Sequence, residues 1–405
     1  MLLGAAVERN GATMTEINLN RRGNAMLNRL CRATLAPTLA AGMSCCLVAT
    51  VPAQSLKKMT LVQMHPNMGI GEEVFLYAVP KHLGYFAAEG LDVDIQNSQT
   101  GMISAQVMQS NNAQVGTTAA AAIMTVREQN GDLVSFFNLK RNPGTFLVVL
   151  KDSPIQKLED LKGKNVGAPS FGAGGGLALK QNLSEIGITP DQYTGIATGA
   201  GPSAIAALRG GQIDALVMWD AMLGATENTG LAVRPVNIPL EDRMVGTTLA
   251  TRQAFANSNP KEVAGYCRAM TKGLVFTMTN TPAAIRIFWK EFPTTKPTNL
   301  DDATSLKNSA HIMRRFLEKA LQDQPEGARL GEFIKPNWQN THAAFVKLGT
   351  LKGSEAATDS YTQPDGGPHA DVHTISELDG PRNPCSQGCS QAQPSRPRAR
   401  QEIGS

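Results

Sequence analysis

The stretch from Tyr193 to Asp220 holds the residues best suited to bind a ligand. Its pattern predicts a strand, a glycine loop, a short helix, a tight turn and a second, buried strand that ends at Trp219. Both strands should run toward the same edge of a parallel sheet, which is where ligands bind in open α/β proteins. We therefore expect the loop and the strand end to face a ligand through Gly199, Gly201, Ser203, Trp219 and Asp220.

Two kinds of site compete for this edge. The residues Gly199-x-Gly201-x-x-Ala204 match the G-x-G-x-x-G/A pattern of a dinucleotide site, and Asp220 stands about 20 residues further on, where a ribose-binding acid would lie. Three features argue against a dinucleotide: the helix is too short, Pro202 removes a backbone donor, and the motif comes late in its unit. We expect the loop to line a small-molecule cleft, with a purely structural turn as the further alternative.

A second glycine loop, PSFGAGGG at 169–176, leads into a predicted helix. Backbone N–H groups and the helix dipole at such a start can bind a carboxylate, sulfonate or phosphate oxygen. No Gly-Lys-Ser/Thr follows, so the loop is not a P-loop; a flexible connector is the alternative. The expected ligand contacts here are Ser170, Phe171, Gly172 and Gly174.

Polar side chains also follow three predicted strands in the first part of the chain. His65 could bind an acidic solute, although a histidine before a proline is commonly a surface loop residue. The paired threonines stand at a helix start, where capping explains hydroxyl groups equally well. The expected contacts from this part are His65, Asn67, Thr117, Thr118 and Asn138.

Trp219 and Asp220 each admit two interpretations. The tryptophan ends an apolar strand, so it could be a core residue, but we favour an aromatic wall against the ligand. Asp220 could bind a cationic group or cap the next helix. The glycine loop at 170–176 favours an acidic ligand, whereas Asp220 with Trp219 favours a flat cation. Of the two, we favour an anionic ligand slightly.

Composition restricts the class of function. The 405 residues are 42% hydrophobic and 18% charged, which allows a substantial core and two domains. The net charge of +4 comes without runs of Lys or Arg, so we expect no nucleic-acid partner. Only Cys267 of the six cysteines lies in the central body, and the histidines there stand in unrelated segments. The sequence predicts no metal site, no cofactor and no catalytic constellation.

The two ends differ from the body. Residues 1–55 form a predicted leader, in which a signal peptide begins near Met26 and is cleaved after Ala53; a membrane anchor is the alternative. Arg29 and Arg32 precede its apolar stretch, and Val51-Pro52-Ala53 is a small-residue cleavage site. Residues 354–405 are rich in Pro, Gly, Ser and Gln, and we expect a disordered tail.

Four segments of the body resemble one family of proteins. They are HLGYFAAEGLDVDI (82–95), VVLKDSPIQKLEDLKGKNVGAPS (148–170), LRGGQIDALVMWDAM (208–222) and NSNPKEVAGYCRAM (257–270). In order and spacing they are similar to the periplasmic solute-binding proteins of ABC transporters of the nitrate, taurine and alkanesulfonate type. The resemblance implies a type II periplasmic binding protein fold, in which a two-strand hinge joins two α/β lobes and the C-terminal helices pack on lobe 1. Lobe 1 would take 57–143 and 247–353, and lobe 2 would take 144–246.

The same resemblance implies a function. A secreted, monomeric, non-enzymatic protein would capture a small solute in the periplasm, preferably an anionic sulfonate or carboxylate, and deliver it to an inner-membrane ABC permease. Two enzymes are the alternatives. One is an enzyme of this fold acting on a pyrimidine or thiamine precursor, but the fungal synthase of that kind carries a cysteine-rich motif where this body has only Cys267. The other is a nucleotide-dependent enzyme that uses the Gly199 loop.

Overall fold

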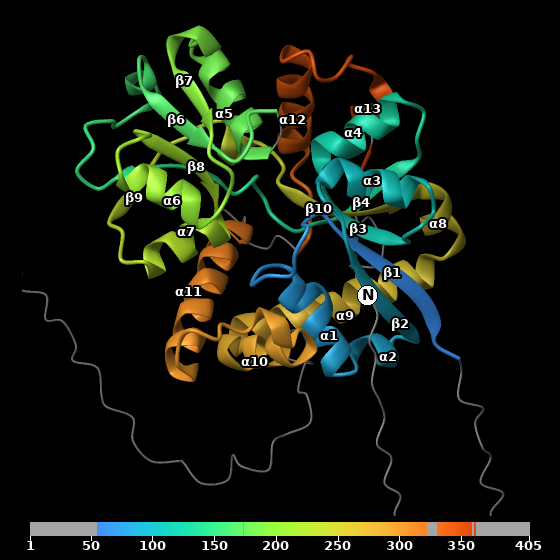
Figure 1. The fold of residues 1–405 in the computed structure, drawn as a ribbon. Helices are drawn as coiled ribbons and strands as arrows, with labels where there is room; N and C mark the ends of the chain where they lie inside the picture. The colour runs from blue at the N-terminus through green and yellow to red at the C-terminus, as the bar shows by residue number, and fades with distance from the viewer. Residues whose placement is uncertain (1–54, 173, 322–329, 359, 362–405) are drawn as a thin grey trace, which may run out of the picture. The chain divides into compact units, whose positions relative to one another are not determined.

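The computed structural model describes residues 55–172, 174–321, 330–358 and 360–361 (Figure 1). They belong to one compact unit, Gln54–Ser405. The predicted signal peptide and the part of the predicted tail after residue 361 lie outside the described residues. Among the described residues no helix is long and apolar enough to cross a membrane.

The first lobe is built on a five-stranded sheet in the order β2-β1-β3-β10-β4. Four of these strands are parallel, and β10 runs antiparallel between β3 and β4. The alternation of strands and helices over 59–139 predicts a parallel sheet. The antiparallel β10 differs from this, and it joins the sheet only after the chain has built the second one. The strands are β1 (Lys57–Gln63), β2 (Leu91–Asn97), β3 (Val115–Ala119), β4 (Leu133–Asn138) and β10 (Thr247–Arg252).

The second lobe repeats this plan in the order β7-β6-β8-β5-β9. Strands β6, β7 and β8 are parallel, and β5 pairs antiparallel with both β8 and β9. The ends of β7 and β8 therefore lie at the same edge, as the sequence predicts, with β6 between them. The strands are β5 (Thr145–Leu150), β6 (Asn165–Ala168), β7 (Thr194–Ala197), β8 (Ala215–Trp219) and β9 (Val233–Val236).

Helices cover both sheets. The first lobe carries η1 (Val74–Ala78), which is a π-helix, followed by α1 (Val79–His82), α2 (Tyr85–Ala88), α3 (Gly101–Gln109) and α4 (Ala120–Glu128). The second carries α5 (Gly174–Glu185), α6 (Pro202–Arg209) and α7 (Asp220–Asn228), with short 3-10 turns η2 (Leu158–Leu161), η3 (Pro190–Gln192) and η4 (Glu241–Arg243). The spacing of apolar residues over 72–89 predicts one helix, but the structure interrupts it at Gly84, which adopts a left-handed conformation with φ of 74°.

The C-terminal part is helical, as expected. It comprises α8 (Gln253–Ser258), α9 (Pro260–Thr279), α10 (Thr281–Glu291), η5 (Pro293–Thr295), α11 (Asp302–Ala320), α12 (Lys335–Lys347) and α13 (Glu355–Thr358). Helices α9 and α10 pack on η1 of the first lobe. Helix α11 contacts both lobes: its Phe316 ring lies 5.8 Å from the ring of Phe75, and its axis runs beside α7 (Figure 1).

The predicted disordered tail begins too early. Residues 354–358, 360 and 361 are ordered, because Ala357 and Tyr361 pack into an apolar cluster with Phe333 and Trp338. The Tyr361 and Trp338 ring centroids are 4.9 Å apart, and the Ser135 N–H donates to the Ser360 carbonyl. Two apolar residues of this polar stretch, Ala357 and Tyr361, therefore anchor it on the first lobe.

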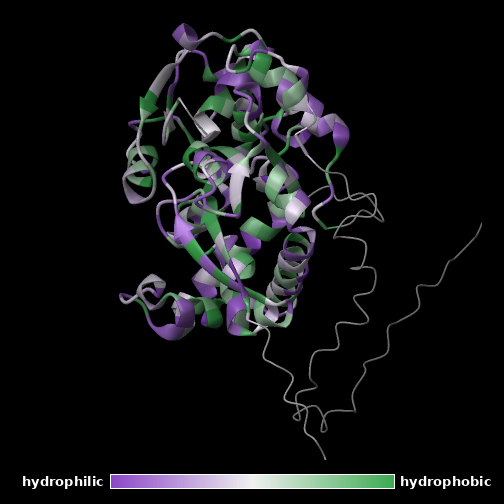
Figure 2. Ribbon diagram, turned by 90° about the vertical axis from the view of Figure 1, so that its right-hand side faces the viewer, coloured by the Kyte–Doolittle hydropathy of each residue, from purple (hydrophilic) through white to green (hydrophobic). Residues whose placement is uncertain are grey.

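Each lobe has its own hydrophobic core. In the first lobe Leu61 of β1 packs with Phe75 and Tyr266, and in the second Leu147 of β5 packs with Val166 and Leu179. Green, hydrophobic ribbon lies mainly in the interior and purple ribbon mainly at the periphery (Figure 2). Because the cores are separate, the strand ends between the lobes are free to carry polar residues.

Candidate ligand-binding cleft

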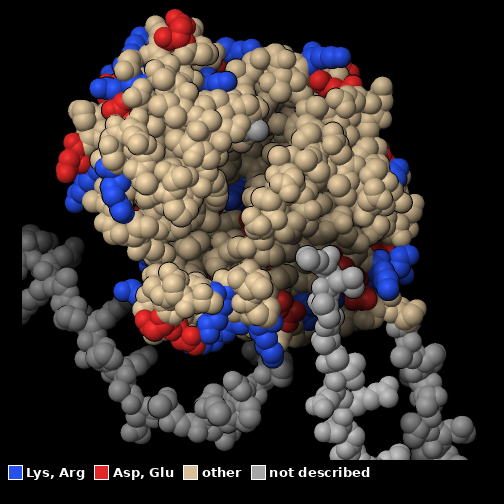
Figure 3. Space-filling view, in the orientation of Figure 1, with Lys and Arg blue, Asp and Glu red and all other residues tan. Residues whose placement is uncertain are grey.

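A cavity of about 540 Å³ lies between the two lobes. Its lining comes from the loop after β1, the start of the helix that contains η1, the crossing into β5, the start of α5 and the end of β8. A hollow with blue and red atoms at its floor opens between the lobes on the surface (Figure 3). Its size suits a small organic molecule.

Trp219 forms an aromatic wall of this cavity. It is the last residue of β8, and its side chain is 40% exposed although the strand before it is buried. Met218 and Val217 line the cavity beside it. A large, partly exposed aromatic side chain that lines a concave site is well placed to stack on a flat solute. The preferred sequence interpretation of Trp219 therefore agrees with its position.

Asp220 and Lys140 form an ion pair on the floor of the cavity. The Lys140 Nζ donates to Asp220 Oδ2 at 2.7 Å, and the two side chains are 7% and 1% exposed. Burial works against the Lys140 ammonium, but the charges of Asp220 and Glu72 outweigh it and raise the pKa of Lys140. The ammonium also lies 4.3 Å from the centre of the Phe316 ring. Asp220 is thus already neutralised by a lysine of the first lobe.

His65 and Glu72 form a second ion pair at the wall of the first lobe. His65 Nε2 lies 3.0 Å from Glu72 Oε1. Burial lowers the pKa of His65, but the charge of Glu72 and the hydrogen bond to it raise that pKa to about 9. Burial raises the pKa of Glu72, but His65 holds it at about 2. Both groups are therefore charged at neutral pH.

Glu73 is a third carboxyl group of the cavity lining, and it takes part in neither of these ion pairs. It stands at the start of the helix that contains η1, lines the cavity and is 4% exposed. No other described residue makes a hydrogen bond or ion pair with its side chain. Burial and the neighbouring Glu72 charge raise the pKa of Glu73 to about 8.

The structure brings five of the predicted site residues to the cavity and leaves the others outside its lining. His65, Asn67, Gly174, Trp219 and Asp220 line it. The remaining predicted residues, which do not, are Thr117, Thr118, Asn138, Ser170, Phe171, Gly172, Gly199, Gly201 and Ser203.

The residues outside the lining have local structural roles. Thr117 Oγ1 accepts from the Met64 N–H at 3.0 Å, Thr118 Oγ1 donates to the Gly101 carbonyl at 2.7 Å, and Asn138 donates to the Glu332 carbonyl. The ring of Phe171 packs against Tyr193 in the core of the second lobe, with 6.4 Å between the centroids. These hydroxyl groups, the Asn138 NH2 group and the phenyl ring are therefore used within the protein.

The two glycine loops reach the cavity less than expected. Ser170 Oγ accepts from the Gly172 N–H in an exposed turn, and neither residue lines the cavity. In the loop at 199–203 only Ala200 lines it, and Ser203 Oγ donates back to the Thr198 carbonyl. The positive φ angles of Gly199 and Gly201, 67° and 82°, shape the turn.

Among the lining residues that the sequence did not predict are three charged side chains, Glu72, Glu73 and Lys140, and the aromatic Phe316. The adjacent acids in GIGEEVFLYAVP were a usable signal, because two carboxylates directly before an apolar run must either cap a helix or face a site. Nothing local marks Phe316, which comes from α11, far away in the sequence. Among the described residues no group of three or more His, Cys, Asp or Glu could hold a metal ion.

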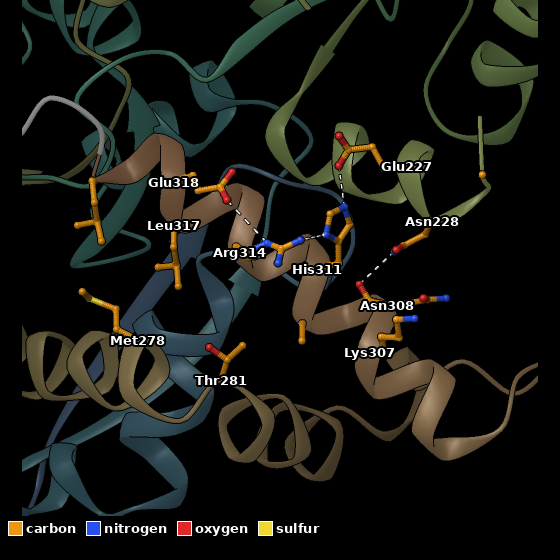
Figure 4. A pocket seen from close by; sticks show the side chains of 13 residues that line it. Glu227, Asn228, Met278, Thr281, Lys307, Asn308, His311, Arg314, Leu317 and Glu318 are labelled. Carbon is orange, nitrogen blue, oxygen red and sulfur yellow. Dashed lines mark hydrogen bonds and ion pairs between the residues drawn. The ribbon is translucent and has the colours of Figure 1, made fainter. Parts of the chain in front are cut away.

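A second hollow, of about 1050 Å³, lies on the flank between α7, α9, α10 and α11 (Figure 4). Its Glu227 carboxylate is bound by His311 at 2.6 Å and by two nitrogens of Arg315 at 2.6 and 2.8 Å. Asn228 donates to the Asn308 carbonyl across it. These contacts hold α11 on α7, and none of the described residues that line the hollow is a buried, unpaired carboxyl group like Glu73.

Comparison with known proteins gives a consistent set of relatives. The family model described as NMT1/THI5 like matches residues 73–284. The 4-amino-5-hydroxymethyl-2-methylpyrimidine phosphate synthase of Aspergillus parasiticus is 26% identical over 67% of this chain and 84% of its own length. The synthase of the same name from Schizosaccharomyces pombe is 28% identical, but the match covers 34% of this chain and only 41% of that protein.

Binding proteins are also among the relatives. The riboflavin-binding protein RibY of Chloroflexus aurantiacus is 23% identical over 74% of this chain and 78% of its own length. Among solved structures, the periplasmic aliphatic sulphonate binding protein SsuA of Escherichia coli has a TM-score of 0.59 and 15% identity, over 76% of this chain and 93% of SsuA. This likeness establishes the periplasmic binding protein fold.

Proposed function

Since the chain belongs to the NMT1/THI5-like family, we propose that it captures a small solute between its two lobes and serves as the solute-binding component of an ABC importer. The family resemblance predicted from the sequence is confirmed, and so is the fold. The proposed role is solute binding, which is the role that the names of the relatives RibY and SsuA describe.

The observation that carries the proposal is the composition of the cavity wall. One side comes from the first lobe, through His65, Glu72 and Glu73, and the other comes from the second lobe, through Trp219. A solute that touches both sides is bound best when the lobes are close together. It would therefore shift the population toward the closed arrangement.

The cellular setting follows from the same proposal. A binding protein of this kind would work in the periplasm as a monomer and present its closed form to an inner-membrane permease. The predicted signal peptide, with cleavage after Ala53, supports export.

An enzyme that acts on a pyrimidine is the second candidate. It is favoured by the similarity to the Aspergillus parasiticus synthase and by the cluster of ionisable groups in the cleft. Catalysis by a cysteine of the described residues is unfavourable, because Cys267 is buried and burial raises the pKa of its thiol. Purified protein that releases a pyrimidine product, or that carries a cofactor with its own absorbance, would favour the enzyme.

Ligand binding tests the main proposal directly. The full chain is screened by thermal shift against nitrate, taurine, sulfonates, carboxylates, aromatic amines and pyrimidines. A solute that raises Tm should bind Trp219→Ala about 10-fold more weakly, because an aromatic pair contributes about 0.5–1.5 kcal/mol beyond the area buried. Trp219→Phe should keep most of the affinity.

Met278→Ala is the matched control. Met278 is 44% exposed and lines the flank hollow, so its removal should leave solute affinity unchanged. A solute whose affinity depends on Met278 and not on Trp219 would place binding in the flank hollow and contradict the proposed cleft.

A further inference from the structure

The charged groups of the cleft do not balance. Three carboxyl groups, Glu72, Glu73 and Asp220, line it together with two cations, His65 and Lys140. His65 is paired with Glu72 at 3.0 Å, and Lys140 is paired with Asp220 at 2.7 Å. When all five groups are ionised the site carries one excess negative charge, and that charge belongs to Glu73.

We propose that the cleft takes a planar organic monocation, such as an amidinium, a guanidinium or a protonated amino-heterocycle, whose N–H groups bind the Glu73 carboxylate while its flat face stacks on Trp219. The inference rests on the proposed solute-binding function and adds to it the charge of the solute and the residue that selects it. Glu73 fits this role because it is nine-tenths buried, lies against the cavity and has no partner among the described residues.

Charge-assisted hydrogen bonds make such a pairing strong. A buried carboxylate gains most from a donor group that is itself charged and geometrically matched, and an amidinium or guanidinium presents parallel N–H groups to its two oxygens. An unpaired buried charge is otherwise costly, which is why the empty site holds Glu73 in its protonated form. The ligand would supply the missing counter-charge.

The remaining walls favour a flat molecule. Trp219 presents an exposed ring, and the neighbouring Val217, Met218, Met68 and Ile70 are apolar. A cation over a tryptophan ring is attracted by the negative charge of the ring face. The aromatic wall and the unpaired carboxyl therefore select the same kind of solute.

An anion is disfavoured by the same contacts. The sequence favoured an anion because of the loop at 170–176, but its Ser170 and Gly172 do not line the cavity. Both cationic side chains of the cleft are already bound to carboxylates. A sulfonate would have the N-terminus of α5 as its main attraction and would lie near three acidic side chains.

Proton release gives a second readout. Burial and the Glu72 charge raise the pKa of Glu73, and His65 and Lys140 lower it, so that it stands at about 8 in the empty site. A bound cation stabilises the carboxylate, so binding at pH 7 should release close to one proton. The observed binding enthalpy will then vary with the ionisation enthalpy of the buffer.

The test compares four phenyl compounds on the full chain by calorimetry: benzamidinium, benzamide and benzoate, whose planar head groups match in shape, and benzenesulfonate. Benzamidinium should bind best and release a proton. Glu73→Gln should weaken it at least about 10-fold, because a hydrogen bond to a charged group contributes about 1.5–3 kcal/mol. Benzamide should bind Glu73→Gln as well as it binds the wild type.

Asp94→Asn is the matched control, because Asp94 is an exposed carboxylate of the same lobe that does not line the cleft. This variant should bind all four probes with the affinity of the wild type. One outcome would overturn the inference and leave the solute-binding function standing. In it, benzamidinium does not bind, whereas benzoate or benzenesulfonate binds the wild type and binds Trp219→Ala more weakly. If no probe and no member of the wider solute panel binds, both are overturned.

Discussion

Lys140 and Asp220 come from different lobes and meet on the floor of the cleft. The lysine directly follows the β4 region of the first sheet, and the aspartate begins α7 in the second lobe. Both side chains are buried, so removal of one leaves a charge with neither water nor a partner. At the scale of single residues, this pair ties the two lobes together at the point where the solute is proposed to bind.

Substitution of Lys140 tests this tie. Lys140→Met should lower the free energy of unfolding by about 3–5 kcal/mol, since the Asp220 carboxylate stays buried and unpaired. The double variant Lys140→Met/Asp220→Asn should recover a large part of that loss. Urea unfolding followed by circular dichroism measures both. A double variant that loses the sum of the two single effects would contradict the pairing.

An exposed ion pair provides the control. Lys347 and Glu185 lie 2.9 Å apart with side chains 54% and 41% exposed. Lys347→Met should change the free energy of unfolding by only about 0–1 kcal/mol, because water already solvates both charges.

The pH dependence of stability follows from His65 and Glu73. Each has a folded pKa above its ordinary value, about 9 for His65 and about 8 for Glu73, so each favours the folded state less as pH rises. The His65 contribution is complete below pH 6.5 and lost through about 9; that of Glu73 is complete below 4.5 and lost through about 8. Between pH 6.5 and 8 both decline, at up to about 1.4 kcal/mol per pH unit each.

Glu73→Gln isolates the two contributions. The variant retains the His65–Glu72 pair, so its stability should decline less steeply than that of the wild type over the same pH range. Denaturant midpoints collected from pH 6 to 9 measure the slopes. Equal slopes for the two proteins would show that Glu73 ionises in the empty protein as an ordinary glutamate does.

The sequence pointed to those lining residues of the candidate cleft that stand at strand ends. Trp219 and Asp220 could be predicted because the end of β8 must reach the edge of the sheet. Glu73 and Lys140 could not, because their role depends on burial between lobes that the local pattern does not describe. Thr117 and Thr118 were also at a strand end, but their hydroxyl groups bind the backbone of neighbouring loops.

At the scale of elements, the two lobes repeat one unit. Strand β3 and helix α4 cover 115–128, and β8 and α7 cover 215–228 with the same lengths. The junction residues are Ala119-Ala120 in the first lobe and Trp219-Asp220 in the second. The scaffold is therefore shared, while Trp219 of the aromatic wall and Asp220 of the ion pair belong to the second copy.

Strand types and most helices could be predicted from periodicity, but the sheet order could not. Strand β10 lies between β3 and β4, although more than 100 residues separate it from either (Thr247 from Asn138). Such pairing depends on contacts that are distant in sequence, which local patterns do not encode. The two-lobed fold itself was predicted through the family resemblance of whole segments.

The contact between α7 and α11 gives a prediction at this scale. Gly224 packs so closely on α11 that an added Cβ would lie 2.9 Å from the Ile312 Cα. Gly224→Ala should therefore lower the free energy of unfolding by about 1–3 kcal/mol through overpacking. Gly172→Ala is the control, since the nearest atom to its Cβ would be Ser170 Oγ at 3.8 Å. Urea unfolding compares the two, and an unaffected Gly224→Ala protein would contradict tight packing of these helices.

At the scale of the whole molecule, the chain crosses between the sheets twice, after β4 and after β9, and α11 touches both lobes. The cleft lies between these connections. A solute there would contact both lobes at once, which is the physical basis of capture by closure. The same arrangement explains why residues distant in sequence, such as Glu73 and Trp219, line one cavity.

Hydrogen–deuterium exchange of the full chain, with and without the solute that raises Tm most, tests the account most directly. Capture between the lobes predicts slower exchange in two separate segments at once: 64–76, at the wall of the first lobe, and 217–224, around Trp219. Protection confined to one lobe, or to residues 307–318 of α11 beside the flank hollow, would contradict binding in the cleft.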